Sequence, residues 1–290
     1  MEYYAHGKLL LSGEYLVLKG ARGLAIPSRY GQRFSYKAQG HDLNWKSYDH
    51  KGELWFEACF SPELQLLDSS SGESGAFLLN LLRIGVELSQ HSIPLGTVET
   101  HLEFPGNWGL GSSSTLTYLI AKWLNIDPYK LFFTTQNGSG YDIACADATT
   151  ALLYKLDKSP EIEKVTLPEV FKNVYFIHLN QKQNSRPAVT NFLKKDHPAQ
   201  TVKTISTITQ RMLEAKSVLE LQKLMDFHER EMSKLLQTPP VKELLFSDFE
   251  GSIKSLGAWG GDFVMALGHN APEYFAHRGY NTIISFSDMI

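Results

Sequence analysis

The chain has 290 residues, of which 43% are hydrophobic and 20% charged, a composition typical of a soluble globular protein with one large domain or two ordinary ones. Its net charge of −3 argues against a general nucleic-acid-binding function. The two cysteines, Cys59 and Cys145, are far apart and have no metal-ligand spacing, which excludes a disulfide framework and favours a reducing compartment.

Membrane and export signals are also missing from the pattern. The first residues lack the order of a signal peptide, and the longest apolar runs are too short to span a bilayer. We therefore expect a cytoplasmic protein, a monomer or homodimer, with neither nucleic acid nor a membrane as a partner.

The first hundred residues predict strands, one long loop and one helix. Apolar and aromatic runs predict strands, a polar stretch predicts a loop, and apolar residues at helical spacing predict a helix. The expected strands are 8–11, 15–18, 33–38 and 53–60; the loop is 39–52, and the helix carries apolar residues from Phe77 to Leu88.

The most informative stretch runs from Val98 to Leu124. Alternation from Val98 to Phe104 predicts a half-buried strand, and apolar residues at helical spacing from Leu116 onwards predict a helix. Between them lies the Gly- and Ser-rich turn 105–115. The unpaired N–H groups and positive dipole at a helix N-terminus favour anion binding there, and the glycines allow close backbone approach. An ordinary serine-capped helix is the simpler alternative.

The remaining chain predicts further helices and strands. Asp127-Pro128 is typical of a capped helix start, and a charged, proline-bounded segment at 157–168 indicates a domain boundary. The other expected helices lie at 141–148, 201–215, 217–236 and just after Pro240, and the strands at 151–156, 174–179, 263–267 and 282–286. Strands and helices do not alternate regularly, which favours an α+β fold.

Three other stretches have unusual residues, each with a structural alternative. Lys8 and Gly13-Glu14 are unusual because they interrupt an apolar strand. The structural alternative is a lysine on an edge strand and a β-bulge at Gly13. Asp142 follows the glycine loop 137–140, or is a favourable first-turn acid. Three glycines within 257–261 indicate a close backbone approach, or a tight turn.

The familiar nucleotide signatures are absent. There is no G-x-x-x-x-G-K-[ST] loop, and the protein-kinase motifs are missing. The central turn is not a dinucleotide-binding fingerprint, because Ser114 stands where a third Gly or Ala should be and no acid follows about 20 residues later.

Together, the four stretches resemble the GHMP kinase superfamily. The order G-K-L-L-L-S-G-E-Y, G-L-G-S-S-S, G-S-G-Y-D and G-A-W-G-G-D is similar to its motifs from residue 6 to about residue 267. The resemblance is strongest to the phosphomevalonate kinase and mevalonate kinase branch, through Gly13-Glu14-Tyr15, Pro187-Ala188-Val189-Thr190 and Asp262.

This resemblance implies an α+β protein of two domains. The N-terminal domain, residues 1–165, would be ribosomal-protein-S5-domain-2-like and bind ATP. The C-terminal domain, residues 166–290, would be ferredoxin-like, with the active site in the cleft between them. The implied reaction is Mg²⁺-dependent transfer of the ATP γ-phosphoryl group to a small metabolite, phosphomevalonate or mevalonate, in isoprenoid precursor biosynthesis.

The resemblance also assigns roles to residues. Lys8 and Asp142 would be catalytic, with Lys8 beside Asp142, which orients or deprotonates the acceptor. Ser113 would also reach Mg²⁺. The implied nucleotide-binding residues are Gly109, Leu110, Gly111, Ser112, Ser113 and Ser114, and the substrate-binding residues are Glu14, Tyr15, Ser139, Gly140, Arg186, Thr190, Gly260 and Gly261.

Two departures from the family pattern keep other functions open. Trp259 replaces a glycine, and Leu131 stands where mevalonate kinase carries a magnesium-binding Glu. A sugar or homoserine kinase, or a non-catalytic binding protein with this fold, are the alternatives. The acceptor and the oligomeric state do not follow from the sequence.

Overall fold

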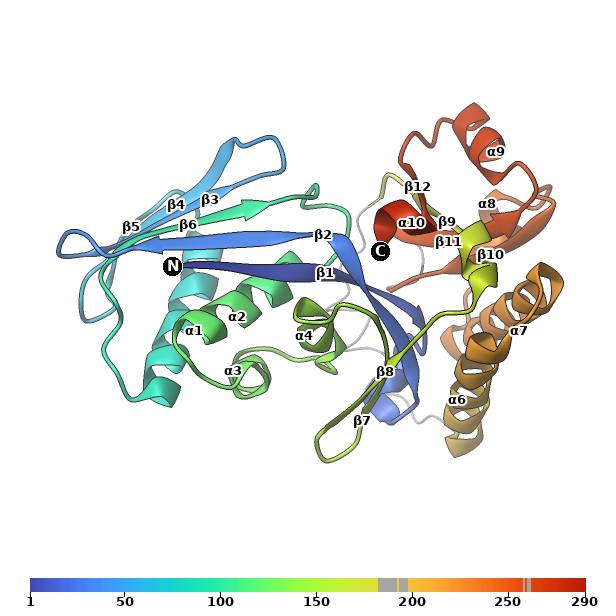
Figure 1. The fold of residues 1–290 in the computed structure, drawn as a ribbon, viewed down its shortest axis with the longest axis horizontal. Coiled ribbons are helices and arrows are strands. Elements are labelled where there is room, and N and C mark those ends of the chain that lie inside the picture. Colours follow the sequence, from blue (N-terminus) through green and yellow to red (C-terminus); the bar gives the residue numbers. More distant parts are fainter. Residues whose placement is uncertain (182–191, 193–197, 258, 260–261) are drawn as a thin grey trace. The chain divides into compact units, whose positions relative to one another are not determined.

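The computed structural model describes residues 1–181, 192, 198–257, 259 and 262–290 (Figure 1). These residues form two compact units that are interleaved along the chain. Unit 1 comprises Met1–Gly7, Tyr30–Gly106 and Leu110–Asp147, and unit 2 comprises Lys8–Arg29, Asn107–Gly109 and Ala148–Ile290.

Two long strands supply residues to both units. Strand β1 spans Glu2–Ser12 and pairs with β2, which spans Gly23–Lys37. The compact units therefore do not follow chain order, whereas the division into 1–165 and 166–290 does. That division into domains stays a prediction.

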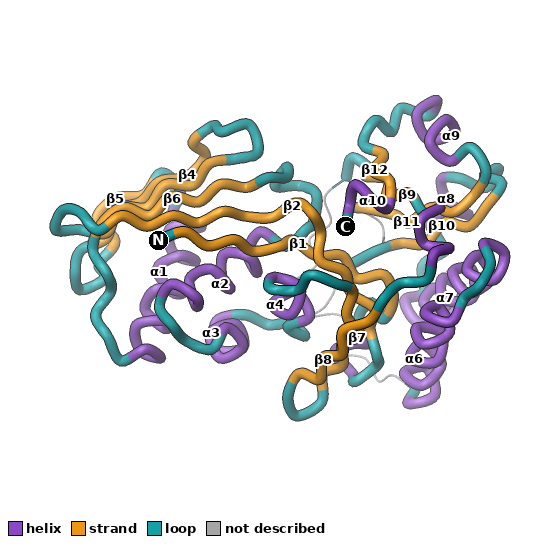
Figure 2. The backbone as a smooth tube through the Cα atoms, viewed as in Figure 1, coloured by secondary structure: helices purple, strands orange, loops and turns teal. Residues whose placement is uncertain are grey.

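Unit 1 is a mixed β-sheet, with both parallel and antiparallel strand pairs, and has helices on one face (Figures 1 and 2). The strand order within it is β5-β4-β3-β6-β2, with β3 parallel to β6 and the other neighbours antiparallel. Its other elements are β3 Leu43–Tyr48, β4 Leu54–Phe60, β5 Leu66–Ser69, α1 Gly72–Ser89, β6 Gly96–Leu102, α2 Ser112–Trp123, α3 Pro128–Thr135 and α4 Tyr141–Ala146.

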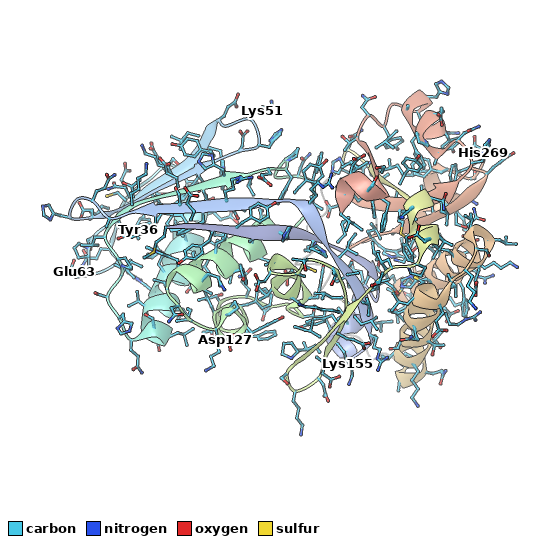
Figure 3. All side chains as sticks on the ribbon, in the orientation of Figure 1. Tyr36, Lys51, Glu63, Asp127, Lys155 and His269 are labelled. Atoms are coloured by element: carbon cyan, nitrogen blue, oxygen red, sulfur yellow. The ribbon has the colours of Figure 1, made fainter. Side chains whose placement is uncertain are left out.

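The core of unit 1 lies between this sheet and helices α1 to α4. Trp123 of α2 packs on Phe34 and Tyr36 of β2, with ring centroids 5.6 and 5.3 Å apart. The Tyr36 hydroxyl, on the side chain marked in Figure 3, donates to Leu95 O at 2.7 Å. These aromatic contacts fix α2, and hence the turn before it, against the sheet.

Unit 2 contains a second, four-stranded antiparallel sheet in the order β10-β11-β9-β12, and pairs β2 with β7 and β7 with β8. Its other elements are η1 Leu16–Lys19, β7 Ala151–Leu156, β8 Pro160–Val165, η2 Glu169–Asn173, β9 Tyr175–His178, α6 Ala199–Glu214, α7 Val218–Leu236, α8 Val241–Leu245, β10 Gly251–Ser255, β11 Phe263–Gly268, α9 Ala271–His277, β12 Ile283–Ser285 and α10 Phe286–Met289. No helix in the described part of the chain combines the length and the apolar character needed to cross a membrane.

The α+β class is confirmed, and several elements follow the sequence pattern closely. Asp127, labelled in Figure 3, caps α3 as expected, with Oδ1 accepting from Tyr129 N at 2.8 Å. Helix α7 begins at the Ser217 cap, whose side chain accepts from Glu220 N. Local capping chemistry is why these starts were predictable.

Two local predictions were wrong. The expected strand at 15–18 is the 3₁₀ helix η1, because Tyr15 has a φ of 59° and Gly20 ends the segment in the left-handed region. The expected loop 39–52 contains β3. The segment 157–168, whose role as a domain boundary stays a prediction, contains β8. Strand β8 is mostly exposed and charged, as edge strands often are.

Candidate active site

Helix α2 begins at a turn without a side-chain cap. Gly109 and Gly111 have φ of 66° and 88°, and Gly111 is the N-cap residue. The N–H groups of Ser114 and Thr115 donate to Gly111 O at 3.0 Å, whereas those of Ser112 and Ser113 have no hydrogen-bond partner among the described residues. The serine-capped alternative is therefore wrong, and the strand–turn–helix is confirmed. Two free donors at a helix N-terminus are suited to an anion.

Asp142 is tied to this helix by Ser114. The Ser114 hydroxyl donates to Oδ2 of Asp142, and Ile143 N donates to Oδ1 at 3.2 Å. Asp142 lies in the first turn of α4, which begins after Gly140 at a φ of 81°. Ser139 and Gly140 are buried beside it in the chain. Unit 1 thus brings together the third serine of the Gly- and Ser-rich turn and the expected catalytic acid.

Lys8, Gly109 and Asp262 converge in unit 2. Lys8 Nζ donates to Gly109 O at 2.8 Å. A Cβ on Gly109 would overlap the Asp262 carboxylate, so only glycine fits this close approach. The Asp262 backbone is held by Leu179 N and Gln181 O at 2.8 Å each. Three of the four unusual stretches therefore meet here. Lys8 and Asp142 belong to different units, and their proximity stays a prediction.

His178 of β9 positions the residues before Gly109, and sequence reasoning missed it. Its Nε2 lies 3.2 Å from Asn107 O, while its Nδ1 accepts from Asn180 N at 3.2 Å, so Nε2 carries the proton and donates. Its ring also packs against Phe263, which is in edge contact with Trp108 at 5.5 Å. A lone apolar-flanked histidine 71 residues away gave no sequence signal.

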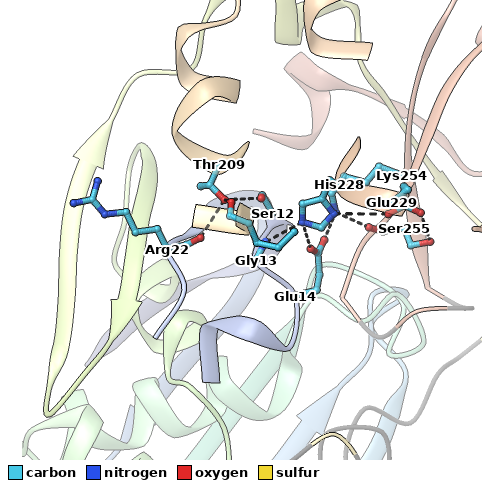
Figure 4. Close-up of polar contacts among 10 residues, drawn as sticks. Ser12, Gly13, Glu14, Arg22, Thr209, His228, Glu229, Lys254 and Ser255 are labelled. Carbon is cyan, nitrogen blue, oxygen red and sulfur yellow. Dashed lines mark hydrogen bonds and ion pairs between the residues drawn. The ribbon is translucent and has the colours of Figure 1, made fainter. Parts of the chain in front are cut away.

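Glu14 lies in a buried polar cluster of unit 2 (Figure 4). Its carboxylate forms an ion pair with Lys254 of β10, and its Oε2 lies 3.2 Å from Nε2 of His228 in α7. Nearby, Ser255 Oγ donates to Glu229 Oε2 at 3.1 Å. These side chains are 0–3% exposed. The substrate-binding role expected for Glu14 stays a prediction, and the partners found here are structural.

The charges in this buried cluster balance only because the pKa values of its side chains are shifted from their ordinary values. Burial alone would raise the pKa of Glu14, but its interactions with Lys254 and His228 together more than offset burial and lower that pKa to about 2. Burial raises the pKa of Glu229 to about 8, and burial lowers the pKa of His228. At neutral pH the cluster therefore holds one carboxylate, one ammonium, a protonated Glu229 and a neutral His228.

Two further expected site residues have clear positions. Tyr15 is 9% exposed and packs on Phe192, with centroids 5.2 Å apart. Leu110 is fully buried. Arg186, Thr190, Gly260 and Gly261 lie outside the described residues, and their roles stay predictions.

The Mg²⁺ prediction rests on Ser113, which is half-buried in the first turn of α2. Among the described residues, no group of three or more His, Cys, Asp and Glu side chains is placed to hold a metal ion. Leu131 is fully buried in the apolar core of unit 1. An unpaired acid would be costly at this position, which accounts for the leucine.

The fold is that of the GHMP kinases, as the sequence resemblance predicted. The chain is similar to Methanococcus jannaschii mevalonate kinase, at 17% identity and a TM-score of 0.65, over 99% of this chain and 98% of that one. It is also similar to Streptococcus pneumoniae phosphomevalonate kinase in complex with phosphomevalonate and AMPPNP, at 16% identity and a TM-score of 0.73, over 99% and 100%.

A third solved structure is a sugar kinase. Lactococcus lactis galactokinase complexed with galactose is similar at 14% identity and a TM-score of 0.67, over 98% of this chain and 92% of that one. No protein-family model and no curated protein sequence matches the chain.

Proposed function

We propose that this protein is an ATP-dependent kinase that transfers the γ-phosphoryl group of ATP to a small metabolite. The observation that carries the proposal is the glycine at the N-terminus of α2, where the Ser112 and Ser113 N–H groups have no partner among the residues that the structure describes. It occurs in a chain whose fold matches known kinases over nearly its whole length.

The residues around Gly109 and Gly111 fit a triphosphate. Both glycines leave the turn without side chains, and two N–H donors with the positive end of α2 supply the attraction. Ser113 would hold Mg²⁺ together with phosphate oxygens, and the ion would neutralise charge on the β- and γ-phosphates. A structure of the phosphomevalonate kinase with AMPPNP supports a nucleotide as the ligand of this fold.

Phosphoryl transfer depends mainly on positioning and charge neutralisation, and two of this chain's side chains would supply them. Asp142 would orient the acceptor oxygen or take its proton. Lys8 would neutralise charge on the transferring group. One hydrogen-bond acceptor of Lys8, Gly109 O, lies in the same turn, so Lys8 would also fix the backbone proposed to face the phosphates.

As acceptor we favour phosphomevalonate or mevalonate, which would assign the protein to isoprenoid precursor biosynthesis, and as location we favour the cytoplasm. Pro187-Ala188-Val189-Thr190 and Asp262 support this choice, as do the mevalonate and phosphomevalonate kinases among the similar structures. The galactokinase similarity favours a sugar as the second candidate. Leu131 and Trp259 would suit a non-catalytic binding protein.

A coupled ADP-release assay tests the proposal directly. Purified protein with MgATP is offered mevalonate, phosphomevalonate, homoserine or galactose, and Asp142→Asn protein is the matched background control. We expect turnover with a mevalonate compound above that with any sugar. Robust galactose phosphorylation with neither mevalonate compound used would overturn the acceptor. ATP binding without turnover on any acceptor would instead identify a binding protein.

A further inference from the structure

The third serine of the turn has a different partner from the first two. Ser112 and Ser113 are half-buried at the start of α2, whereas Ser114 is 5% exposed and its hydroxyl donates to Asp142 Oδ2. Both residues belong to unit 1, and each lies in the first turn of its helix.

A serine hydroxyl has a single proton to donate. With that proton directed to Asp142, Ser114 has none for a phosphate oxygen. The nucleotide-binding role expected for Ser114 therefore competes with the hydrogen bond observed here. Phosphate donation is left to the Ser112 and Ser113 groups.

We propose that Ser114 is a positioning residue that holds the Asp142 carboxylate in the orientation needed for phosphoryl transfer. The inference rests on the proposed function, since it presumes that Asp142 serves the acceptor. Asp142 is held from both sides, by Ser114 Oγ at Oδ2 and by Ile143 N at Oδ1. A carboxylate has about four acceptor sites, so lone pairs remain for the acceptor.

The transfer step balances with these groups. The acceptor oxygen forms a bond to the γ-phosphorus, and the bond from that phosphorus to the β–γ bridging oxygen breaks, leaving its electron pair on ADP. Where the acceptor is a hydroxyl, its proton moves to a free lone pair of Asp142 and then to solvent. Ser114 keeps its own proton throughout.

The hydrogen bond from Ser114 to Asp142 fixes the Asp142 carboxylate relative to the turn that is proposed to bind the phosphates. The same first turn of α2 carries the two free N–H donors and the hydroxyl that holds Asp142. An error in the carboxylate position of about 1 Å can cost on the order of 100-fold in rate. Loss of the Ser114 hydroxyl should therefore affect the rate and not the binding of ATP.

The test compares Ser114→Ala and Ser114→Thr with Thr115→Val. Thr115 is the matched control, because it is buried in the same helix and its hydroxyl bonds Gln32 Oε1 at 2.7 Å and Ser112 O at 2.9 Å instead of Asp142. We expect Ser114→Ala to lower kcat roughly 10- to 100-fold at an unchanged KM for ATP. Ser114→Thr should restore most of the rate, and Thr115→Val should keep it despite a similar loss of melting temperature.

A double-mutant cycle of Ser114→Ala and Asp142→Asn on unfolding free energy provides a readout that needs no turnover, and the bond predicts non-additive effects. A raised ATP KM at unchanged kcat in Ser114→Ala would make Ser114 a phosphate ligand and overturn the inference, as would unchanged kinetics or an additive cycle. The proposed function would survive each of these results. A wild-type protein inactive on every acceptor would refute the proposed function and, with it, the positioning role.

Discussion

Gly111 occupies a backbone conformation that side-chain-bearing residues rarely adopt. Its φ of 88° turns the chain into α2, and the next two N–H groups have no partner in the described part of the chain. A β-branched residue is strained at such an angle and would place methyl groups where an anion must approach. The proposed nucleotide site thus depends on a single missing side chain.

We expect MgATP to raise the melting temperature of the wild-type protein by roughly 5 °C at about 100 times its dissociation constant, because the ligand binds only the folded state. Gly111→Val should abolish this shift. Differential scanning fluorimetry with and without MgATP measures it.

Gly40 is the matched control for backbone strain. It also has positive φ, at 77°, and a Cβ there would meet nothing within 4 Å. Gly40→Val should keep the ATP-induced shift. A folded Gly111→Val protein that is stabilised as strongly as wild type would move the nucleotide site elsewhere.

At the scale of elements, Glu229 of α7 couples pH to the packing of that helix on β10. Its pKa is raised to about 8 from an ordinary 4.5, so between these values the folded protein holds a proton that the unfolded chain releases. This contribution to stability is complete below about pH 4.5 and is lost as pH rises to about 8.

We therefore expect the melting temperature of wild type minus that of Glu229→Gln to fall between pH 5 and 8 and to level off above it. The comparison removes the opposite contribution of His228, whose lowered pKa favours the folded state as pH rises towards 6.5. Thermal melts across this range measure it, with Glu231→Gln as the control on the same helix. A difference that is constant with pH would show that Glu229 carries no shifted proton.

Helices and strands that are specified by nearby residues could be predicted from the sequence. Those that depend on pairing with distant segments could not. The starts of helices α3 and α7 can be recognised in the sequence from their N-cap residues, Asp127 and Ser217. Strand β3 does have alternating burial, but its polar residues hid the pattern, and its place depends on pairing with β4 and β6. An apolar run such as 15–18 fits a strand or a buried helical turn equally well.

The same limit applies to the site. Motif order alone located the turn, Lys8, Asp142 and Glu14. The partners that hold them could not be found, because Glu14 and Lys254 are separated by 240 residues and Gly13 and His228 by 215. The hydrogen bond from Ser114 to Asp142 could likewise not be predicted from the sequence, since it forms only when α2 and α4 pack together.

At the scale of the whole molecule, the proposed mechanism assigns Lys8 and Asp142 to one reaction. Lys8 belongs to unit 2 and Asp142 to unit 1. We expect Asp142→Asn to lower kcat roughly 10²- to 10⁴-fold while MgATP still binds, because the α2 turn is untouched. Lys8→Met should also cost more in rate than in ATP affinity.

The double variant should lose less than the sum of the two effects, since groups that serve one transition state are not additive. Steady-state kinetics of the four proteins measure this, and Lys19→Met is a control for loss of a surface charge. Fully additive losses, or unchanged turnover in Asp142→Asn, would contradict a shared role.

Because the two compact units are interleaved along the chain, we also predict that neither the N-terminal nor the C-terminal half folds alone. A fragment of residues 166–290 lacks Glu14, so the fully buried Lys254 would lose its ion-pair partner. Such a broken pair costs about 3–5 kcal/mol, comparable to the stability of many domains. We expect no cooperative thermal melt from this fragment by circular dichroism, and recovery on co-expression with 1–165. A cooperative melt of the fragment alone would support independent domains.

The same ion pair sets a delay during protein synthesis. Glu14 leaves the ribosome early, and Lys254 is made 240 residues later. At about 5–20 residues per second, the N-terminal segment waits roughly 10–50 s for its partner. Throughout that time the Glu14 carboxylate lacks the ammonium that it faces in the finished protein, so the buried cluster around it cannot close. Slower synthesis therefore lengthens the interval in which the N-terminal segment is open to aggregation, and chaperone supply should affect the yield of folded protein.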